Sequence, residues 1–171
     1  MSDHRTDRMI RVDQAGEYGA TRIYAGQIAV LGNRGPGASQ IAEMARQEAA
    51  HLEKFNALMA QRGVRPTALQ PFWSAAGYAL GAATALMGPE AAMACTAAIE
   101  TEIDRHYSDQ LEELGESDPE LSQMVEEFRA DEREHHDVAI AAGAERAPGY
   151  PLLSAAIRLG CRAAIRISER I

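Results

Sequence analysis

Apolar residues recur at intervals of three and four along most of the chain, which is the period of an amphipathic α-helix. Breaks rich in glycine and proline interrupt this pattern, and the pair Asp118-Pro119 is a typical helix start. The pattern predicts six helices, at residues 8–31, 39–62, 72–87, 89–114, 119 to about 143, and 152–170. Four long helices and two shorter ones predict an all-α fold, an antiparallel four-helix bundle with two appended helices.

Composition and charge narrow the class of protein. The 171 residues are 46% hydrophobic and 5% aromatic, with few β-branched runs, which excludes an all-β fold. The length predicts a single domain over residues 1–171. A net charge of −8 argues against a nucleic-acid partner, and two cysteines argue against a disulfide framework. Residues 1–8 contain no apolar run, so we expect no signal peptide.

The longest stretch without charge, residues 66–89, suggests a membrane span at first sight. Proline at positions 71 and 89 restricts continuous helix to residues 72–87. A helix of this length extends for about 24 Å, which is shorter than the ~30 Å hydrocarbon core of a bilayer. We therefore expect this helix to be interfacial or buried.

Several core-facing positions carry ionisable side chains. Continuing the apolar stripes of the second and fifth predicted helices leads to four such residues: Glu48, His51, Glu132 and His135. The stripes of the first and fourth helices, which include Ile28 and Leu111, turn one carboxylate inward each: Glu17 and Glu100. Unpaired buried charge is too costly to keep, so these residues need a compensating partner.

The spacing of the six residues indicates what that partner is. A glutamate and a histidine three positions apart lie one turn apart on one helix face, and the chain contains this pair twice. Each pair follows a helix that contributes a lone glutamate. Four carboxylates and two histidines on four helices form the ligand set of a dinuclear carboxylate site, and the set suits iron better than zinc. The ligands alone do not separate iron from manganese.

Further polar residues lie close to this face. We expect three of them to hydrogen-bond the histidines of the metal site: Asp13, Asp104 and His106. Three others lie off the inward phase and are expected in solvent or beside the ligands: Glu102, Glu134 and His136.

The two shorter helices have the features of membrane-surface segments. The sixth carries four arginines at intervals of four beside an apolar face: Arg158, Arg162, Arg166 and Arg170. A basic amphipathic helix can lie on an anionic bilayer, although a helix docked on the bundle with a solvated arginine stripe fits as well. The third helix is uncharged and begins with Phe72-Trp73, a residue pair typical of interfaces, and this strengthens the membrane interpretation.

Five stretches of the chain carry a resemblance to a known family: residues 10–20, 22–32, 51–56, 106–107 and 132–137. On these residues the sequence resembles the demethoxyubiquinone hydroxylases, ferritin-like diiron monooxygenases of ubiquinone biosynthesis. The family's iron ligands match the six residues already named, which the resemblance makes the catalytic ones. Gln14, where the family often has histidine, and the additional acid Glu102 depart from the pattern without removing a ligand.

The resemblance implies a ferritin-like fold, two iron ions and O2 as co-substrate. One oxygen atom would enter the ring of a polyprenylated methoxy-methyl-benzoquinone or its quinol, with electrons from NADH or from the reduced substrate. Tyr24 and Tyr107 would lie in the pocket or beside the ligands. The protein would be peripheral to a membrane, on the cytoplasmic face of a bacterial inner membrane or the matrix face of a mitochondrial one. A homodimer or a lipid-binding partner protein would fit its apolar helices.

Two other classes stay open at this point. A ferritin-like or rubrerythrin-like iron store or peroxidase would use the same ligands, although the chain lacks the Cys-x-x-Cys pattern of a rubredoxin module. A purely structural bundle would pair the six inward residues with one another.

Overall fold

The computed structural model describes residues 4–33 and 35–170, and all regular secondary structure within them is helical. The helices are α1 (His4–Leu31), α2 (Ala38–Arg62), α3 (Gln70–Leu86), α4 (Pro89–Leu114), α5 (Pro119–Ala141) and α6 (Tyr150–Ser168), and a 3₁₀ turn, η1 (Ala144–Arg146), links the last two. The all-α prediction is confirmed, as is the start of α5, where the Asp118 side chain accepts a hydrogen bond from the Leu121 amide at 3.1 Å.

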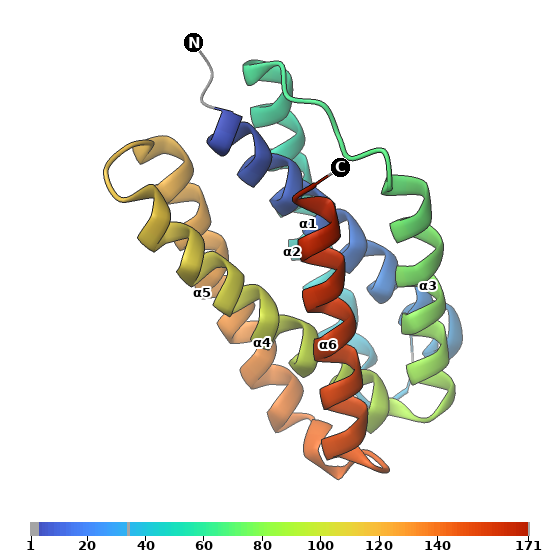
Figure 1. Ribbon diagram of the computed structural model, residues 1–171. Helices are drawn as coiled ribbons and strands as arrows, with labels where there is room; N and C mark the ends of the chain where they lie inside the picture. The colour runs from blue at the N-terminus through green and yellow to red at the C-terminus, as the bar shows by residue number, and fades with distance from the viewer. Residues whose placement is uncertain (1–3, 34, 171) are drawn as a thin grey trace.

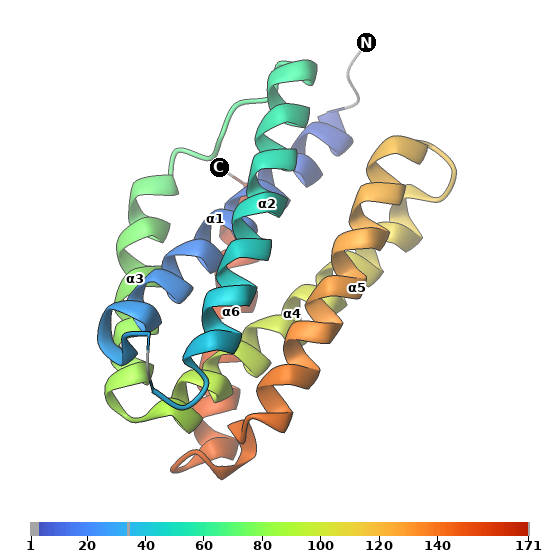
Figure 2. The same cartoon turned by 180° about the vertical axis from the view of Figure 1, so that it is seen from behind.

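Four of the helices, α1, α2, α4 and α5, form a four-helix bundle (Figure 1). α1 packs along α2 and α4 packs along α5, so the bundle consists of two helical hairpins that face each other (Figure 2). The two hairpins approach each other less closely than the two helices within each hairpin do. Long side chains therefore fill the space between the hairpins.

Apolar side chains form two clusters along this interior. One contains Phe55, Leu121 and Phe128, and the other contains Met44 and Met93. On α2 and α5, the segments between the residues of the two clusters carry buried carboxylates and histidines. The bundle thus has an apolar end on each side of a polar middle.

The inward stripe of α1 differs from the predicted one near its C-terminal end. Ile28, expected to face inward, is 37% exposed, whereas the neighbouring Gln27 is fully buried. The Nε2 group of Gln27 donates to the carbonyl oxygen of Ala92 at 3.0 Å. The prediction for Ile28 was wrong because a buried polar side chain is well tolerated once it is hydrogen-bonded.

The two remaining helices pack on the outside of the bundle. α6 lies on α4 and touches α1, on the side opposite α2 and α5 (Figures 1 and 2). α3 lies along α1, and its Phe72 and Leu86 side chains are exposed. Within the part of the chain that the structure describes, no helix combines the length and the apolar character needed to cross a membrane.

Glycines bring the backbones of α1 and α3 into direct contact. A Cβ atom added at Gly81 would lie 1.9 Å from the backbone oxygen of Ile23, and one added at Gly26 would lie 2.2 Å from that of Tyr78. Helices approach this closely only where residues without side chains meet.

We expect Gly81→Ala to lower the free energy of unfolding by about 1–3 kcal/mol, because the added methyl group forces α3 away from α1. Gly160→Ala is the matched control, since Gly160 lies within α6 and a Cβ atom there meets no neighbour. The control should raise stability by roughly 0.5–1 kcal/mol through its helix propensity. Urea unfolding followed by circular dichroism measures both, and a stabilised Gly81→Ala variant would contradict the close approach.

Candidate metal centre

The polar middle of the bundle consists of six ionisable side chains that come from all four core helices. α1 and α4 each contribute one glutamate, and α2 and α5 each contribute a glutamate and a histidine: Glu17, Glu100, Glu48, His51, Glu132 and His135. Each of the six is at most 3% exposed. The structure thus brings together all six ionisable residues that the sequence placed on inward faces.

The six residues form two overlapping groups with metal-ligand geometry. Both groups contain Glu48 and Glu132. The first group also contains Glu17 and His51, and the second also contains Glu100 and His135. Within each group, one potential ligand atom per residue lies within 4.8 Å of all the others. The shared residues are Glu48 and Glu132, which lie where carboxylates could bridge two metal positions.

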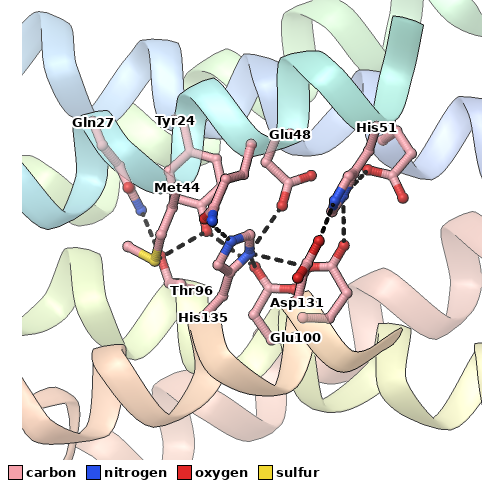
Figure 3. A network of polar contacts seen from close by, with 12 residues as sticks. Tyr24, Gln27, Met44, Glu48, His51, Thr96, Glu100, Asp131 and His135 are labelled. Carbon is pink, nitrogen blue, oxygen red and sulfur yellow. Dashed lines mark hydrogen bonds and ion pairs between the residues drawn. The ribbon is translucent and has the colours of Figure 1, made fainter. Parts of the chain in front are cut away.

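Both histidines direct the same ring nitrogen toward this centre (Figure 3). His51 Nδ1 lies 3.3 Å from a carboxylate oxygen of Glu132 and 3.5 Å from one of Glu17. His135 Nδ1 lies 3.1 Å from carboxylate oxygens of both Glu48 and Glu132. The two imidazoles therefore face the shared carboxylates from opposite ends of the cluster.

The electrostatics of the cluster fit a cation-binding site. Burial, together with the charge of neighbouring carboxylates, raises the pKa of Glu48 and of Glu100 well above the ordinary value. In addition, buried oxygen or nitrogen atoms of five cluster residues have no hydrogen-bond partner among the described residues: Glu17, Glu48, His51, Glu100 and Glu132. Unsatisfied buried acceptors are rare in folded proteins, and divalent cations would satisfy them.

The outward-facing nitrogens of the two histidines have partners that the sequence analysis missed. His51 Nε2 lies 2.9 Å from Oδ2 of Asp131, and His135 Nε2 lies 2.7 Å from Oε1 of Gln47. Each partner immediately precedes the glutamate of a Glu-x-x-His pair. A search of the positions flanking these pairs for acceptors could have found both.

Two tyrosines hydrogen-bond the lone glutamates across the bundle. The Tyr24 hydroxyl on α1 donates to Glu100 on α4 at 3.0 Å, and the Tyr107 hydroxyl on α4 donates to Glu17 on α1. The arrangement is reciprocal, because each tyrosine follows the glutamate of its own helix at the same spacing. Both phenols are buried beside carboxylates, which raises the pKa of each.

The prediction that three side chains hydrogen-bond the site histidines was wrong: Asp13, Asp104 and His106 have other partners. Asp13 accepts from Gln110 at 2.7 Å and lies 3.0 Å from His106 Nε2, so it pairs with two residues of α4 and not with a site histidine. Asp104 accepts from Arg129 Nε at 2.8 Å. These side chains lie beside the inward face, where nearer partners take up their hydrogen bonds.

Glu102 also differs from expectation. Its side chain is 1% exposed rather than solvated, and it accepts from Arg158 Nε at 2.6 Å and lies 3.5 Å from Arg162 Nε. It points away from the metal cluster because it is two residues from Glu100 on α4, on the face that α6 covers. Two of the four arginines expected at a membrane thus hold α6 on the bundle, and Arg166 and Arg170 are exposed.

We expect Glu48→Gln to stabilise the metal-free protein by about 1–3 kcal/mol, because a neutral amide removes the cost of either burying or protonating a carboxylate whose pKa the cluster raises. Added Fe²⁺ or Co²⁺ should then stabilise the wild type much more than the variant. Glu53→Gln, at an exposed site on the same helix, is the control and should leave both quantities unchanged. Thermal unfolding with and without metal measures them, and a destabilised metal-free Glu48→Gln protein would contradict the argument.

Comparison with known proteins agrees with this architecture. The family model described as "Ubiquinone biosynthesis protein COQ7" matches residues 4–168. A Rhodospirillum rubrum protein named 3-demethoxyubiquinol 3-hydroxylase is 52% identical over 165 residues, which cover 96% of this chain and 78% of the relative. The human protein named NADPH-dependent 3-demethoxyubiquinone 3-hydroxylase, mitochondrial, is 54% identical over 169 residues, with 96% and 77% covered. The yeast 5-demethoxyubiquinone hydroxylase, mitochondrial, is 44% identical over 181 residues, with 96% and 78% covered. With its buried Glu/His cluster in a four-helix bundle, the chain belongs to the COQ7 family of ubiquinone biosynthesis proteins.

Proposed function

We propose that this protein is a diiron monooxygenase that hydroxylates the ring of a polyprenylated demethoxyubiquinone or its quinol. The observation that carries the proposal is the pair of overlapping four-residue groups that share Glu48 and Glu132. The names of its relatives supply the substrate class, since they act on demethoxyubiquinone or demethoxyubiquinol. On this proposal residues 1–171 act as one diiron domain.

Each metal position would have its own glutamate and histidine. Glu17 and His51 would hold one iron, Glu100 and His135 the other, and the two shared glutamates would bridge them. When bound, the two iron ions supply O2 activation and the electron transfer that it requires. The four carboxylates would neutralise the four positive charges of two ferrous ions, so the loaded centre adds no net charge to the interior.

The remaining residues of the site hold these ligands and keep water away. Tyr24 and Tyr107 donate to one oxygen of Glu100 and Glu17, respectively, which fixes the orientation of each carboxylate. The Phe128 ring stacks on His51 with ring centroids 3.9 Å apart. This contact closes the side of the imidazole to solvent and restricts its rotation.

The reaction consumes two electrons beyond those of the C–H bond. One atom of O2 enters the ring C–H bond to give C–OH, and the other takes up two protons and two electrons and leaves as water. A reduced pyridine nucleotide would supply the electrons. The family resemblance implied NADH or the reduced substrate as the electron source, whereas several relatives are named NADPH-dependent.

A polyprenyl quinone resides in a bilayer, so we also propose that the protein associates peripherally with a membrane. The outer helices carry large exposed apolar side chains: Phe72, Leu86, Leu152 and Leu159. Trp73 is half-buried, and Arg166 and Arg170 extend from the last turns of α6 and beyond. A surface that presents both exposed apolar side chains and exposed arginines is suited to an anionic lipid surface on the inner-membrane face where the quinone is made. A homodimer or a lipid-binding partner would cover the same apolar helices.

We expect the chain to restore ubiquinone in a strain that lacks its demethoxyubiquinone hydroxylase. A strain that carries the Glu132→Ala variant should accumulate the demethoxy precursor instead, because the substitution removes a shared ligand. Glu134→Ala, an exposed residue on the same helix, is the matched control and should restore ubiquinone. Lipid extraction and mass spectrometry measure both quinones.

Two outcomes would contradict parts of the proposal. A wild-type protein that binds two irons and leaves the precursor unchanged would refute the substrate and favour an iron store or peroxidase. Activity retained in Glu132→Ala would refute the shared-ligand assignment.

A further inference from the structure

The partners of the two histidines cross the interior in opposite directions. Asp131 on α5 reaches His51 on α2, and Gln47 on α2 reaches His135 on α5. Each therefore braces the histidine of the opposite Glu-x-x-His pair from the position just before its own glutamate. We call these contacts the Asp131 brace and the Gln47 brace.

Both braces fix the same form of the imidazole ring. A carboxylate oxygen and an amide oxygen are acceptors, so each histidine donates its Nε2–H outward. Nδ1 is then the nitrogen of each ring that is left to bind a cation, and in both histidines it faces carboxylates of the cluster (Figure 3). In geometry the two braces are equivalent.

The braces differ in charge. Asp131 carries a carboxylate whose side chain is 44% exposed, so solvent screens it in part, whereas the Gln47 amide is neutral. A carboxylate acceptor polarises the imidazole more strongly and makes the opposite ring nitrogen a better donor to a cation. His51 is therefore the stronger donor of the two.

The two halves of the site supply the same kinds of ligand. Each half supplies one lone glutamate, one Glu-x-x-His pair and one tyrosine bonded to the opposite glutamate. Four positions before each shared glutamate, the halves carry Phe128 and Met44, which are both uncharged. Among the groups that bind the outward-facing ring nitrogens, the two braces thus supply the difference in charge.

We propose that the Asp131 and Gln47 braces make the two metal positions unequal. The position of Glu17 and His51 takes a divalent cation first, and the position of Glu100 and His135 fills second. The inference rests on the proposed metal centre and adds an order of filling to it. Asp131 and Gln47 act as positioning residues through the histidines, since neither belongs to the two groups with ligand geometry.

The test is a metal titration of the full-length, metal-free protein labelled with ¹⁵N-histidine. Zn²⁺ is the probe, because it is diamagnetic and carries out no redox chemistry. Ring-nitrogen spectra report His51 and His135 separately, with assignments from His51→Gln and His135→Gln. In the wild type, one equivalent of Zn²⁺ should shift the His51 signals, and the second equivalent those of His135. Calorimetry should give two steps whose affinities differ by about tenfold or more, as expected for a partner of a metal-bound histidine.

Two single variants separate charge from structure. Asp131→Asn keeps an oxygen acceptor of similar size and loses the charge, so the affinity of the first step should fall toward that of the second. Gln47→Glu adds a carboxylate behind His135, so the affinity of the second step should rise toward that of the first. A brace with a merely structural role would leave the Asp131→Asn titration like that of the wild type.

The double variant Asp131→Asn/Gln47→Glu exchanges the two braces and should reverse the order, with His135 shifting first. Simultaneous shifts of both histidines in the wild type, or an unchanged order in the double variant, would overturn the inference while leaving a two-metal centre intact. A protein whose histidine signals do not respond to Zn²⁺ would overturn the metal centre itself, and the inference with it.

Discussion

Four carboxylate side chains share the interior of this bundle, and the cost of burying them constrains the rest of the structure. Each is at most 2% exposed, and the two histidines among them offer only part of the hydrogen bonding that the oxygens require. The bundle accommodates this layer by separating its two hairpins and by packing apolar clusters at both ends. The interior therefore has an arrangement that could hold cations, and this arrangement lowers the stability of the metal-free protein.

The helical phase made much of this predictable from the sequence. The apolar stripes indicated the six inward residues, because the number of residues between two positions of an α-helix determines whether they lie on the same face. Breaks at glycine and proline located all six helices of the described chain to within a few residues. These features depend on local sequence alone.

The features that the sequence did not reveal depend on which helices are neighbours. Glu102 lies off the inward phase of α4, and only the position of α6 explains why it is buried against Arg158 and Arg162. Asp104 pairs with Arg129 for the same reason, since its nearest cation comes from α5. Gln27 is buried because a backbone carbonyl oxygen of α4, that of Ala92, lies opposite it and accepts its hydrogen bond. The phase of one helix indicates which residues face away from solvent but not which residues they meet.

A helix on the outside of a bundle must be attached to it and must also present a surface. The backbone contact between α1 and α3 lets different residues meet these two requirements. An amphipathic helix usually packs its large apolar side chains against the rest of the protein, so few of them are available for its outer surface. Here Gly81 and Gly26 make the attachment. Phe72 and Leu86 are left exposed, and the chemistry of that outer surface can change over evolutionary time while the seat of the helix stays the same. The residues that attach α3 to the bundle are therefore different from those that form its exposed surface.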